Sequence, residues 1–378
     1  MDKFSFFSNI LSFVSTFFEN ILKIATLLIP WYQENKRDLP WRATRNPYYI
    51  WLSEILLQQT RVAQGLPYYL KFVEHFPTIK KLADAREEDI LNLWQGLGYY
   101  SRARNLHHTA QVIAYQYNCR FPSNYQDIRA LKGIGDYTAA AIASFAFGLP
   151  HAVIDGNVNR VISRLFGIEK PINKPDGQAE IKIALEQIFD PSRPDIWNQA
   201  IMEFGALQCT PRNPNCTDCP LNTNCLAWSS KKVNIIPTKE GKTKVTPVYH
   251  SYLVMRLGSK TYIQKRETGI WKNLYQFPLI EKQMSDSEVI NHFTEEFGIR
   301  KTIHLHSIRE IEHILTHRKI FAKFYTISLN TGSEILKNNI FEIELDDLGK
   351  VFPTSVLTLK YLKQQKNCLQ RMLIVNSI

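Results

Sequence analysis

Apolar residues recur with helical spacing through the first part of the chain, up to about residue 228. Gly, Pro, Asn and Asp residues separate these runs, as they commonly do between short helices. The clearest helical runs lie at 47–62, 68–76, 87–98, 104–117 and 158–167. An amphipathic helix is also expected at 21–34, and residues 1–20 read as an N-terminal extension of unassigned role. The pattern therefore predicts a mostly helical domain over 21–228.

The pattern changes in residues 229–246, which carry five lysines and few apolar positions. This composition is typical of a linker. Beyond it, strands are expected at 248–258, 260–267 and 318–329, and a helix at 285–298. A Gly-Ser turn separates the first two strands. Residues 247–378 are therefore predicted to form a second, smaller α+β domain.

The apolar N-terminal stretch allows a signal peptide, although its details argue against one, and it predicts no membrane span. Polar residues interrupt it at Asn9, Glu19, Asn20 and Lys23, and no small-residue cleavage site follows. No uninterrupted run reaches the roughly 20 apolar residues that a spanning helix needs. We expect no association with a membrane.

The charge balance allows two interpretations. The chain has 46 basic and 35 acidic residues, a formal net charge of +11. Such an excess suits a polyanionic partner such as nucleic acid, but a solvated charged surface explains it equally well. Charge alone does not choose between the two.

Four of the six cysteines are clustered as Cys209, Cys216, Cys219 and Cys225, in the spacing C-x6-C-x2-C-x5-C. Clustering of this kind suits a metal centre in a reducing compartment better than a disulfide framework. Four thiolates can hold a structural zinc ion or an iron–sulfur cluster. The long loops fit paired zinc knuckles poorly, which favours the iron–sulfur cluster.

Glu54 lies in the apolar run "WLSEILLQQTRV". In apolar surroundings its pKa would rise, and the carboxyl group would stay protonated as a general acid. The spacing alone favours a plainer interpretation, in which Glu54 is exposed on the polar face of a helix with Gln58 and Arg61.

Asp155 precedes Gly156 and a helical run in "VIDGNVNR". It is well placed to cap a helix that starts near Asn157. It is also a candidate second carboxylate facing Glu54, because cleavage of a glycosidic bond uses paired carboxyl groups of unequal pKa. The residues leave both interpretations open.

The segment "LKGIGDYTAA" places Gly133 and Gly135 just before a helical run. Glycines allow a sharp turn, and amides at a helix start suit a phosphate group. Tyr137 lies just inside the expected helix.

Together these segments resemble the helix-hairpin-helix DNA glycosylases, and within them the adenine DNA glycosylases of the MutY type. The resemblance rests on the hairpin "LKGIGDYTAAAIASFAFG", on "VIDGNVNRVISR" and on the four cysteines. The segments "WYQENKRDLPWR", "WLSEILLQQTRV" and "LWQGLGYYSRARNLH" extend it. It covers residues 21–228 and continues more weakly to the C-terminus. It implies a helix-hairpin-helix glycosylase domain with one [4Fe–4S] cluster in a loop at 209–225, followed by a Nudix-like domain.

The resemblance also implies a reaction. Adenine opposite 8-oxoguanine or guanine in duplex DNA is flipped out, Glu54 protonates its N7, and Asp155 stabilises the sugar cation. Tyr137 and Asn157 orient the site. The family's bifunctional relatives have a strand-cutting lysine where Tyr137 stands, so base removal without strand cleavage is expected.

Further residues match the family's DNA contacts. The hairpin amides of Gly133 and Gly135 match its phosphate contact. Other matching positions are Trp41, Arg42 and Gln199 in the adenine pocket, and Gln59 and Tyr99 at the wedge in the base stack. A monomeric, cytoplasmic bacterial enzyme at the nucleoid is implied.

In the second domain, "GIWKNLYQFP" and "EEFGI" resemble parts of a Nudix domain. Asn291 and His292 stand where a Nudix box has Arg and Glu, which argues against a metal site for pyrophosphate hydrolysis. Thr316 and His317 match the 8-oxoguanine-sensing loop, although Leu315 replaces the family's usual phenylalanine.

Two other functions compete with adenine removal. One is an endonuclease III-like glycosylase with lyase activity, against which Tyr137 and the second domain argue. The other is a non-catalytic iron–sulfur regulator that binds DNA and needs no pair of carboxylates. An inert Glu54→Gln substitution would favour the regulator.

Overall fold

The structure is a computed structural model that describes residues 24–241, 244–297, 304–329 and 339–375. It divides into two compact units, one of Met1–Ala83 with His108–Gly241 and the other of Asp84–His107 with Lys242–Ile378. The helix expected at 21–34 is observed over residues 24–35. The extension at 1–20 lies outside the described residues.

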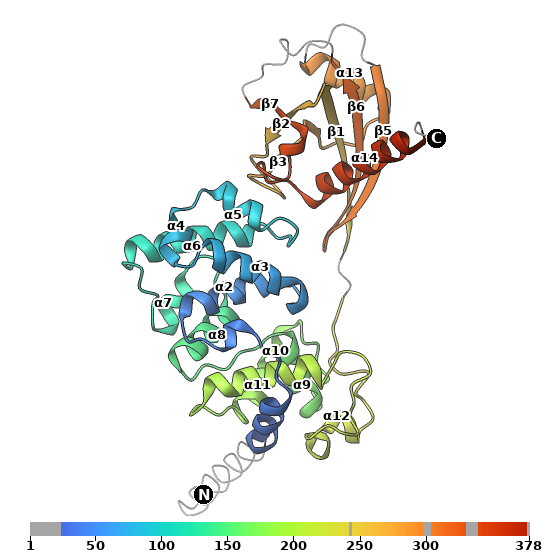
Figure 1. Cartoon of the computed structure of the whole chain (residues 1–378). Helices are drawn as coiled ribbons and strands as arrows, with labels where there is room; N and C mark the ends of the chain where they lie inside the picture. The colour runs from blue at the N-terminus through green and yellow to red at the C-terminus, as the bar shows by residue number, and fades with distance from the viewer. Residues whose placement is uncertain (1–23, 242–243, 298–303, 330–338, 376–378) are drawn as a thin grey trace, which may run out of the picture. The chain divides into compact units, whose positions relative to one another are not determined.

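The first unit is built from short helices, as predicted (Figure 1). Its elements are η1 (Pro40–Arg42), α2 (Pro47–Leu57), α3 (Val62–His75), α4 (Ile79–Asp84, ending at the boundary), α7 (Tyr125–Ala130), α8 (Asp136–Phe147), α9 (Gly156–Leu165), α10 (Pro175–Glu186), α11 (Pro194–Leu207), η2 (Asn222–Asn224) and α12 (Leu226–Ser229). The remaining helices of this region are α5 (Glu87–Leu93), in the second unit, and α6 (Ser101–Gln116), which crosses the boundary. Each predicted helical run therefore contains a helix.

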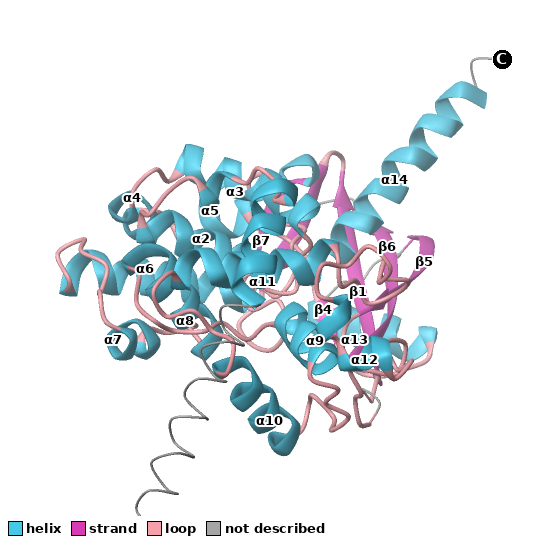
Figure 2. Cartoon of the chain, turned by 90° about the horizontal axis from the view of Figure 1, so that it is seen from below, coloured by secondary structure: helices cyan, strands magenta, loops and turns pink. Residues whose placement is uncertain are grey.

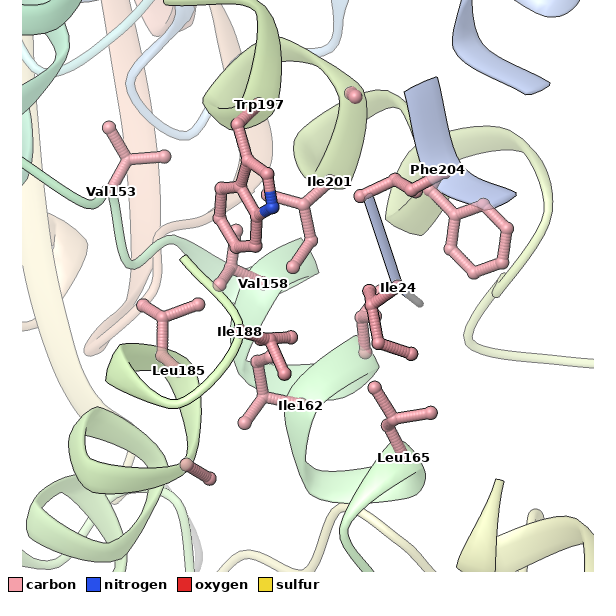
Figure 3. Close-up of a cluster of buried hydrophobic side chains, with 14 of the residues drawn as sticks. Ile24, Val153, Val158, Ile162, Leu165, Leu185, Ile188, Trp197, Ile201 and Phe204 are labelled. Atoms are coloured by element: carbon pink, nitrogen blue, oxygen red, sulfur yellow. The ribbon is translucent and has the colours of Figure 1, made fainter. Parts of the chain in front are cut away.

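One hydrophobic core of the first unit joins α9, α10, α11 and the helix at 24–35. Figure 3 shows side chains from these elements pointing toward one another, among them Ile24, Ile162, Leu185, Trp197 and Phe204. Trp197 is completely buried. This core fixes α9 against α11, and both helices contribute to the site described below.

The second unit contains a seven-stranded mixed sheet, seen in magenta in Figure 2. Its main path runs β3-β2-β1-β6-β5, with β4 paired to β1 and β7 paired to β2. The strands are β1 (Thr246–Leu257), β2 (Lys260–Lys265), β3 (Tyr275–Gln276), β4 (Leu279–Ile280), β5 (His304–Ile314), β6 (Arg318–Ser328) and β7 (Ile340–Glu344). A short η3 (Leu345–Asp347) follows β7. Strands β1 and β6 pair in parallel, with Tyr252 opposite Phe324, and the other pairs are antiparallel.

Two helices cover opposite faces of this sheet. Alternate residues of β1 pack on different sides, because successive side chains of a strand point to opposite faces. Leu253 and Met255 pack with α13 (Asp286–Phe297), whereas Tyr252 and Val254 pack with α14 (Val356–Val375). The three long predicted elements, β1, β6 and α13, are confirmed, and β5, β7 and α14 were not anticipated from the sequence.

The segment 84–107 groups with the second unit, although the sequence placed it inside a helical domain at 21–228. Gln95 explains part of this grouping, because its Nε2 donates to the Gly349 carbonyl at 2.9 Å and its Oε1 accepts from the Thr354 amide at 3.0 Å. The division into a glycosylase domain at 21–228 and a second domain at 247–378 therefore stays a prediction.

The predicted linker at 229–246 is not uniformly free of packing. Ile236 is almost completely buried, and the Thr238 carbonyl accepts a hydrogen bond from the Ile172 amide at 3.0 Å. Residues up to 241 therefore belong to the first unit, and the strand β1 already starts at Thr246. The lysine-rich composition gave no indication that Ile236 is buried in the first unit.

Among the helices that the structure describes, none has the length and apolar character required to cross a membrane.

Candidate active site and cysteine loop

A cavity of about 190 Å³ in the first unit is lined by both predicted catalytic carboxyl groups, Glu54 and Asp155. The other predicted residues on its wall are Tyr137, Asn157, Trp41, Arg42 and Gln199. They come from η1, α2, α8, α9 and α11. Residues spread over most of the first unit are thus brought to one small space.

Glu54 is buried, with only 7% of its surface exposed. The plainer interpretation from spacing, an exposed glutamate sharing a helix face with Gln58 and Arg61, is therefore wrong. Helix α2 ends at Leu57, so Gln58 and Arg61 do not continue its polar face. Almost the whole of α2 is apolar and buried, and it carries Glu54 into the cavity wall.

Burial raises the pKa of Glu54 from 4.5 to about 7. A hydrogen bond from Tyr137 and the positive charge of Arg42 oppose this rise, and the negative charge of Asp155 adds to it. Near neutral pH the Glu54 carboxyl therefore holds a proton in a substantial fraction of molecules. This is the protonation state that a general acid needs.

Asp155 is both the helix cap and a wall of the cavity. Its Oδ1 accepts hydrogen bonds from the amides of Asn157 at 2.8 Å and Val158 at 2.7 Å, and its Oδ2 accepts from Asn157 Nδ2 at 2.9 Å. Burial raises the pKa of Asp155, and these hydrogen bonds oppose the rise. The sequence left open whether Asp155 is a helix cap or a second carboxylate near Glu54. The two interpretations are compatible, because the same carboxylate caps α9 and lines the cavity.

Tyr137 is the second residue of α8 and lies in the cavity with Glu54 and Asp155. Burial, followed by the charges of the two carboxyl groups, raises its pKa well above the usual value of 10. The phenol is therefore neutral and can donate its hydrogen to Glu54. No amine stands at this position.

A close contact between α9 and α11 holds Asn157 in place. A Cβ atom added to Gly205 would lie 2.7 Å from the Asn157 Cβ and 3.0 Å from its carbonyl oxygen. Only glycine permits this approach, so Gly205 sets the distance between α11 and the start of α9. Sequence inspection gave no signal for this role.

Two charged residues on the cavity wall were also missed. Arg37 and Glu203 line the cavity, and Glu203 is 1% exposed. The spacing of apolar residues does not single out Glu203, because one acidic residue in an amphipathic helix such as α11 is usually exposed. Only the fold brings its carboxylate to two arginines from the N-terminal segment.

The hairpin between α7 and α8 has the predicted turn. Gly133 adopts a φ of 82°, whereas Gly135 has a φ of −91° and caps α8. Of the two glycines, only Gly133 therefore uses the left-handed backbone that glycine allows. Within the described residues, neither amide has a protein acceptor, so both are available to an anion.

The two predicted wedge residues share an unusual backbone. Gln59 and Tyr99 are exposed residues with φ values of 55° and 48°. Left-handed backbone is uncommon for residues other than glycine, and such strain is often found at functional sites. Within the second unit, the Tyr99 hydroxyl is hydrogen-bonded to Thr316 Oγ1. The structure thus brings together Tyr99, predicted to act as a wedge, and Thr316 of the predicted sensing loop.

Thr316 and His317 form the exposed turn between β5 and β6, and Leu315 is anchored beside them. The Leu315 amide donates to the Arg318 carbonyl at 2.8 Å, and its side chain packs on the core between the sheet and α14. Leu315 therefore supports the turn by packing.

All four cysteines line a single cavity at the end of α9 and α11. Two arginines of α9 hold this loop, since Arg160 Nε donates to the Cys209 carbonyl at 2.7 Å and Arg164 Nη1 donates to Cys209 Sγ at 3.4 Å. The donor set is entirely sulfur, which fits an iron–sulfur cluster or zinc. Within the described ranges, no group of three His, Cys, Asp or Glu residues is arranged for one metal ion.

Comparison with protein families finds two matches. Residues 52–189 match the HhH-GPD superfamily base excision DNA repair proteins, and residues 251–364 match the NUDIX domain. The chain is 36% identical to the adenine DNA glycosylase of Buchnera aphidicola subsp. Baizongia pistaciae, over 82% of this chain and 88% of that protein. It is 34% identical to the adenine DNA glycosylase of Arabidopsis thaliana, over 83% of this chain and 59% of that protein. The mouse enzyme is 30% identical, over 80% and 70% of the two chains.

Among solved structures, the chain resembles a thermostable thymine-DNA glycosylase, with a TM-score of 0.51 and 30% identity. The match covers 56% of this chain and 98% of that structure.

Proposed function

The chain belongs to the family of adenine DNA glycosylases, and on that premise we propose that it excises adenine paired with 8-oxoguanine, or with guanine, from duplex DNA. The observation that carries this proposal is the cavity in which Glu54, a buried carboxyl group with a pKa near 7, lies with the capping carboxylate Asp155. Such a pair suits the two opposite charges that develop when a glycosidic bond breaks.

In the proposed reaction an adenine is flipped out of the helix into this cavity. Glu54 donates its proton to N7 of the base, which makes adenine a better leaving group. The bond between the sugar and the base then breaks, and its electron pair leaves with the base. Water adds to the sugar cation and loses a proton, which leaves an abasic site.

Asp155 supplies the negative charge for the sugar cation. Its three hydrogen bonds fix the carboxylate before the reaction starts, so no reorientation is needed as the cation forms. Asn157 holds the second carboxylate oxygen, and Tyr137 orients Glu54. Because Tyr137 is not an amine, it cannot form the Schiff base that leads to strand cleavage.

The remaining cavity residues recognise the base. The Tyr32 hydroxyl donates to Gln199 Oε1 at 2.8 Å, which orients the Gln199 amide on the cavity wall. Trp41 contacts Tyr69 edge-on, with ring centroids 5.0 Å apart, and provides an apolar wall. With Arg42, these residues are proposed to line the adenine pocket.

DNA contacts are proposed at both units. The free amides of Gly133 and Gly135 take a backbone phosphate, the kind of contact that positions DNA without reading its sequence. Gln59 and Tyr99 fill the gap left by the flipped base. Thr316 and His317 read the 8-oxoguanine. In this scheme the domain over 21–228 performs excision, 229–246 is the linker, and the domain over 247–378 recognises the lesion.

The four cysteines are proposed to hold one [4Fe–4S] cluster. Arg164 donates a hydrogen bond to Cys209 Sγ, as expected for a side chain that supports a thiolate ligand. The cluster would order the loop at 209–225, and it would take no part in base excision.

We further propose a monomeric enzyme of the bacterial cytoplasm that works at the nucleoid.

The test is a single-turnover assay of adenine release from duplexes with adenine opposite 8-oxoguanine, guanine or thymine. We expect release from the first two and the fastest release opposite 8-oxoguanine. Glu54→Gln is the matched control, because it keeps the shape of the side chain and removes the proton donor. Equal release from all three duplexes, or release by Glu54→Gln at the wild-type rate, would contradict the proposal.

A further inference from the structure

Glu203 binds two arginines at once. Arg42 Nη1 and Nη2 donate to its Oε1 and Oε2 at 2.9 and 2.7 Å. Arg37 Nε and Nη2 donate to the same two oxygens at 2.8 and 2.6 Å, and the Arg37 amide adds a bond of 2.9 Å to Oε1. Bidentate arginine–carboxylate pairs of this kind fix the orientation of both side chains as well as pairing their charges.

The arrangement also ties two distant parts of the chain together. Glu203 lies on α11, whereas Arg37 precedes η1 and Arg42 is the last residue of η1. Arg42 Nη1 donates in addition to the Arg37 carbonyl at 3.0 Å. The segment from Arg37 to Arg42, which includes Trp41, is therefore held against α11 by one carboxylate.

This cluster lies on the wall of the cavity that contains Glu54. Arg37, Arg42 and Glu203 all line it. The Glu203 side chain is 1% exposed, and the side chains of Arg42 and Arg37 are 16% and 37% exposed. The solvent therefore screens Arg42 and Glu203 only weakly.

The main influences on the Glu54 carboxyl come from burial and from three residues that face it. Arg42 from η1 favours the ionised carboxylate, and so does the hydrogen bond from Tyr137 of α8. Asp155, before α9, and burial favour the protonated form. Two arginines and one glutamate leave the cluster with one net positive charge, so the charge of Glu203 offsets half of that of the arginines.

We infer that Glu203 is a positioning residue for base excision, which fixes the Arg37–Arg42 segment on the cavity wall and offsets the positive charge that would otherwise remove the proton from Glu54. This inference rests on the proposed function, because it assigns the Glu54 proton to the reaction. Burial raises the pKa of Glu203, but its five hydrogen bonds outweigh this effect and lower the pKa to about 2. Glu203 therefore stays ionised near neutral pH and can offset the arginine charges there.

The test compares the pH dependence of single-turnover adenine release in the full-length protein. In wild type the rate should fall on the alkaline side as Glu54 loses its proton. Glu203→Gln leaves both arginine charges without compensation, so this alkaline limb should move down by about one pH unit, and the rate at pH 8 should fall about tenfold. Arg37→Gln removes one positive charge and should move the limb in the opposite direction.

The double variant Arg37→Gln/Glu203→Gln restores the net charge and should bring the limb back toward wild type. Because Arg37 is partly exposed, Arg37→Gln keeps the test possible even if Glu203→Gln folds poorly. Asp190→Asn is the matched control. Asp190 is also a buried carboxylate, bound to Ser192 and Arg193, but it does not line the cavity.

Glu203→Gln with a lower rate at every pH but an unmoved limb would overturn the inference, as would an equal shift in Asp190→Asn. Wild-type protein that releases no adenine would overturn the proposed function instead. In that case the proton of Glu54 can still be followed without substrate, through the pH at which the free energy of unfolding stops falling, because this pH follows the pKa of Glu54 in the folded state. An identical pH dependence in wild type and Glu203→Gln would then reject the inference by itself.

Discussion

Replacing Glu54 with glutamine should stop base release and, at neutral pH, make the protein more stable. Glu54 is buried in the wall of the cavity, and its surroundings favour the neutral carboxyl group. In the unfolded chain the same group ionises freely. Raising the pH therefore stabilises the unfolded state more than the folded one. Glutamine has nearly the same shape and never carries the charge.

The size of the effect follows from the two pKa values. Burial raises the pKa of Glu54 from 4.5 to about 7, and this gap corresponds to roughly 3.4 kcal/mol. Because the pKa is higher in the folded state, stability is greatest below pH 4.5 and falls as pH rises to about 7. Between pH 5 and pH 8 the free energy of unfolding should fall by roughly 2.5 kcal/mol on account of this residue.

The assay is urea unfolding of wild type and Glu54→Gln in parallel from pH 5 to pH 8, followed by tryptophan fluorescence. The difference in unfolding free energy should grow with pH in favour of the variant. Glu34→Gln, at an exposed glutamate of the first helix, is the control and should follow wild type. A constant difference between wild type and Glu54→Gln across this range would refute the protonated, buried carboxyl group.

The other predictions concern the remaining parts of the proposed machinery. Asp155→Asn should keep the helix cap and melt near wild type, but release adenine slower by a factor on the order of one hundred or more; a normal rate would remove Asp155 from the mechanism. Tyr137→Lys should gain some strand cleavage, whereas wild type should leave abasic strands intact until heat or base is applied; trapping of wild type on DNA by borohydride, at the level of a known lyase, would contradict this. Protein purified without oxygen should be brown and contain about four irons per chain, and one zinc without iron would disprove the cluster. Thr316→Val should reduce the preference for 8-oxoguanine over guanine about fivefold, the value of a hydrogen bond worth about 1 kcal/mol, and an unchanged preference would place lesion recognition elsewhere.

The local features of the site were predictable from the sequence. Asp155 caps α9 as its position before Gly156 indicated, and Gly133 makes the left-handed turn before α8. The strands at β1 and β6 and the helix α13 follow the apolar pattern. Each of these features depends on residues within a few positions of one another, so a short window of sequence contains the necessary information.

The environment of Glu54 was not predictable in this way. Spacing favoured an exposed glutamate, because a charged residue near Gln58 and Arg61 is usually solvated. The structure ends α2 at Leu57 and buries Glu54 against Tyr137 and Asp155. Its raised pKa comes from loss of water around the carboxyl group, and only packing of distant helices removes that water.

The sequence by itself determined the family, the group of four cysteines and the residue types available for catalysis, since each is carried by a motif of neighbouring positions. Only the tertiary structure decided which of them meet. It brought Arg37 and Arg42 onto Glu203 of α11, and it allowed α11 to approach Asn157 closely at Gly205. Protonation and charge compensation depend on burial and on the distances between groups far apart in the chain, and no local pattern of residues records those distances.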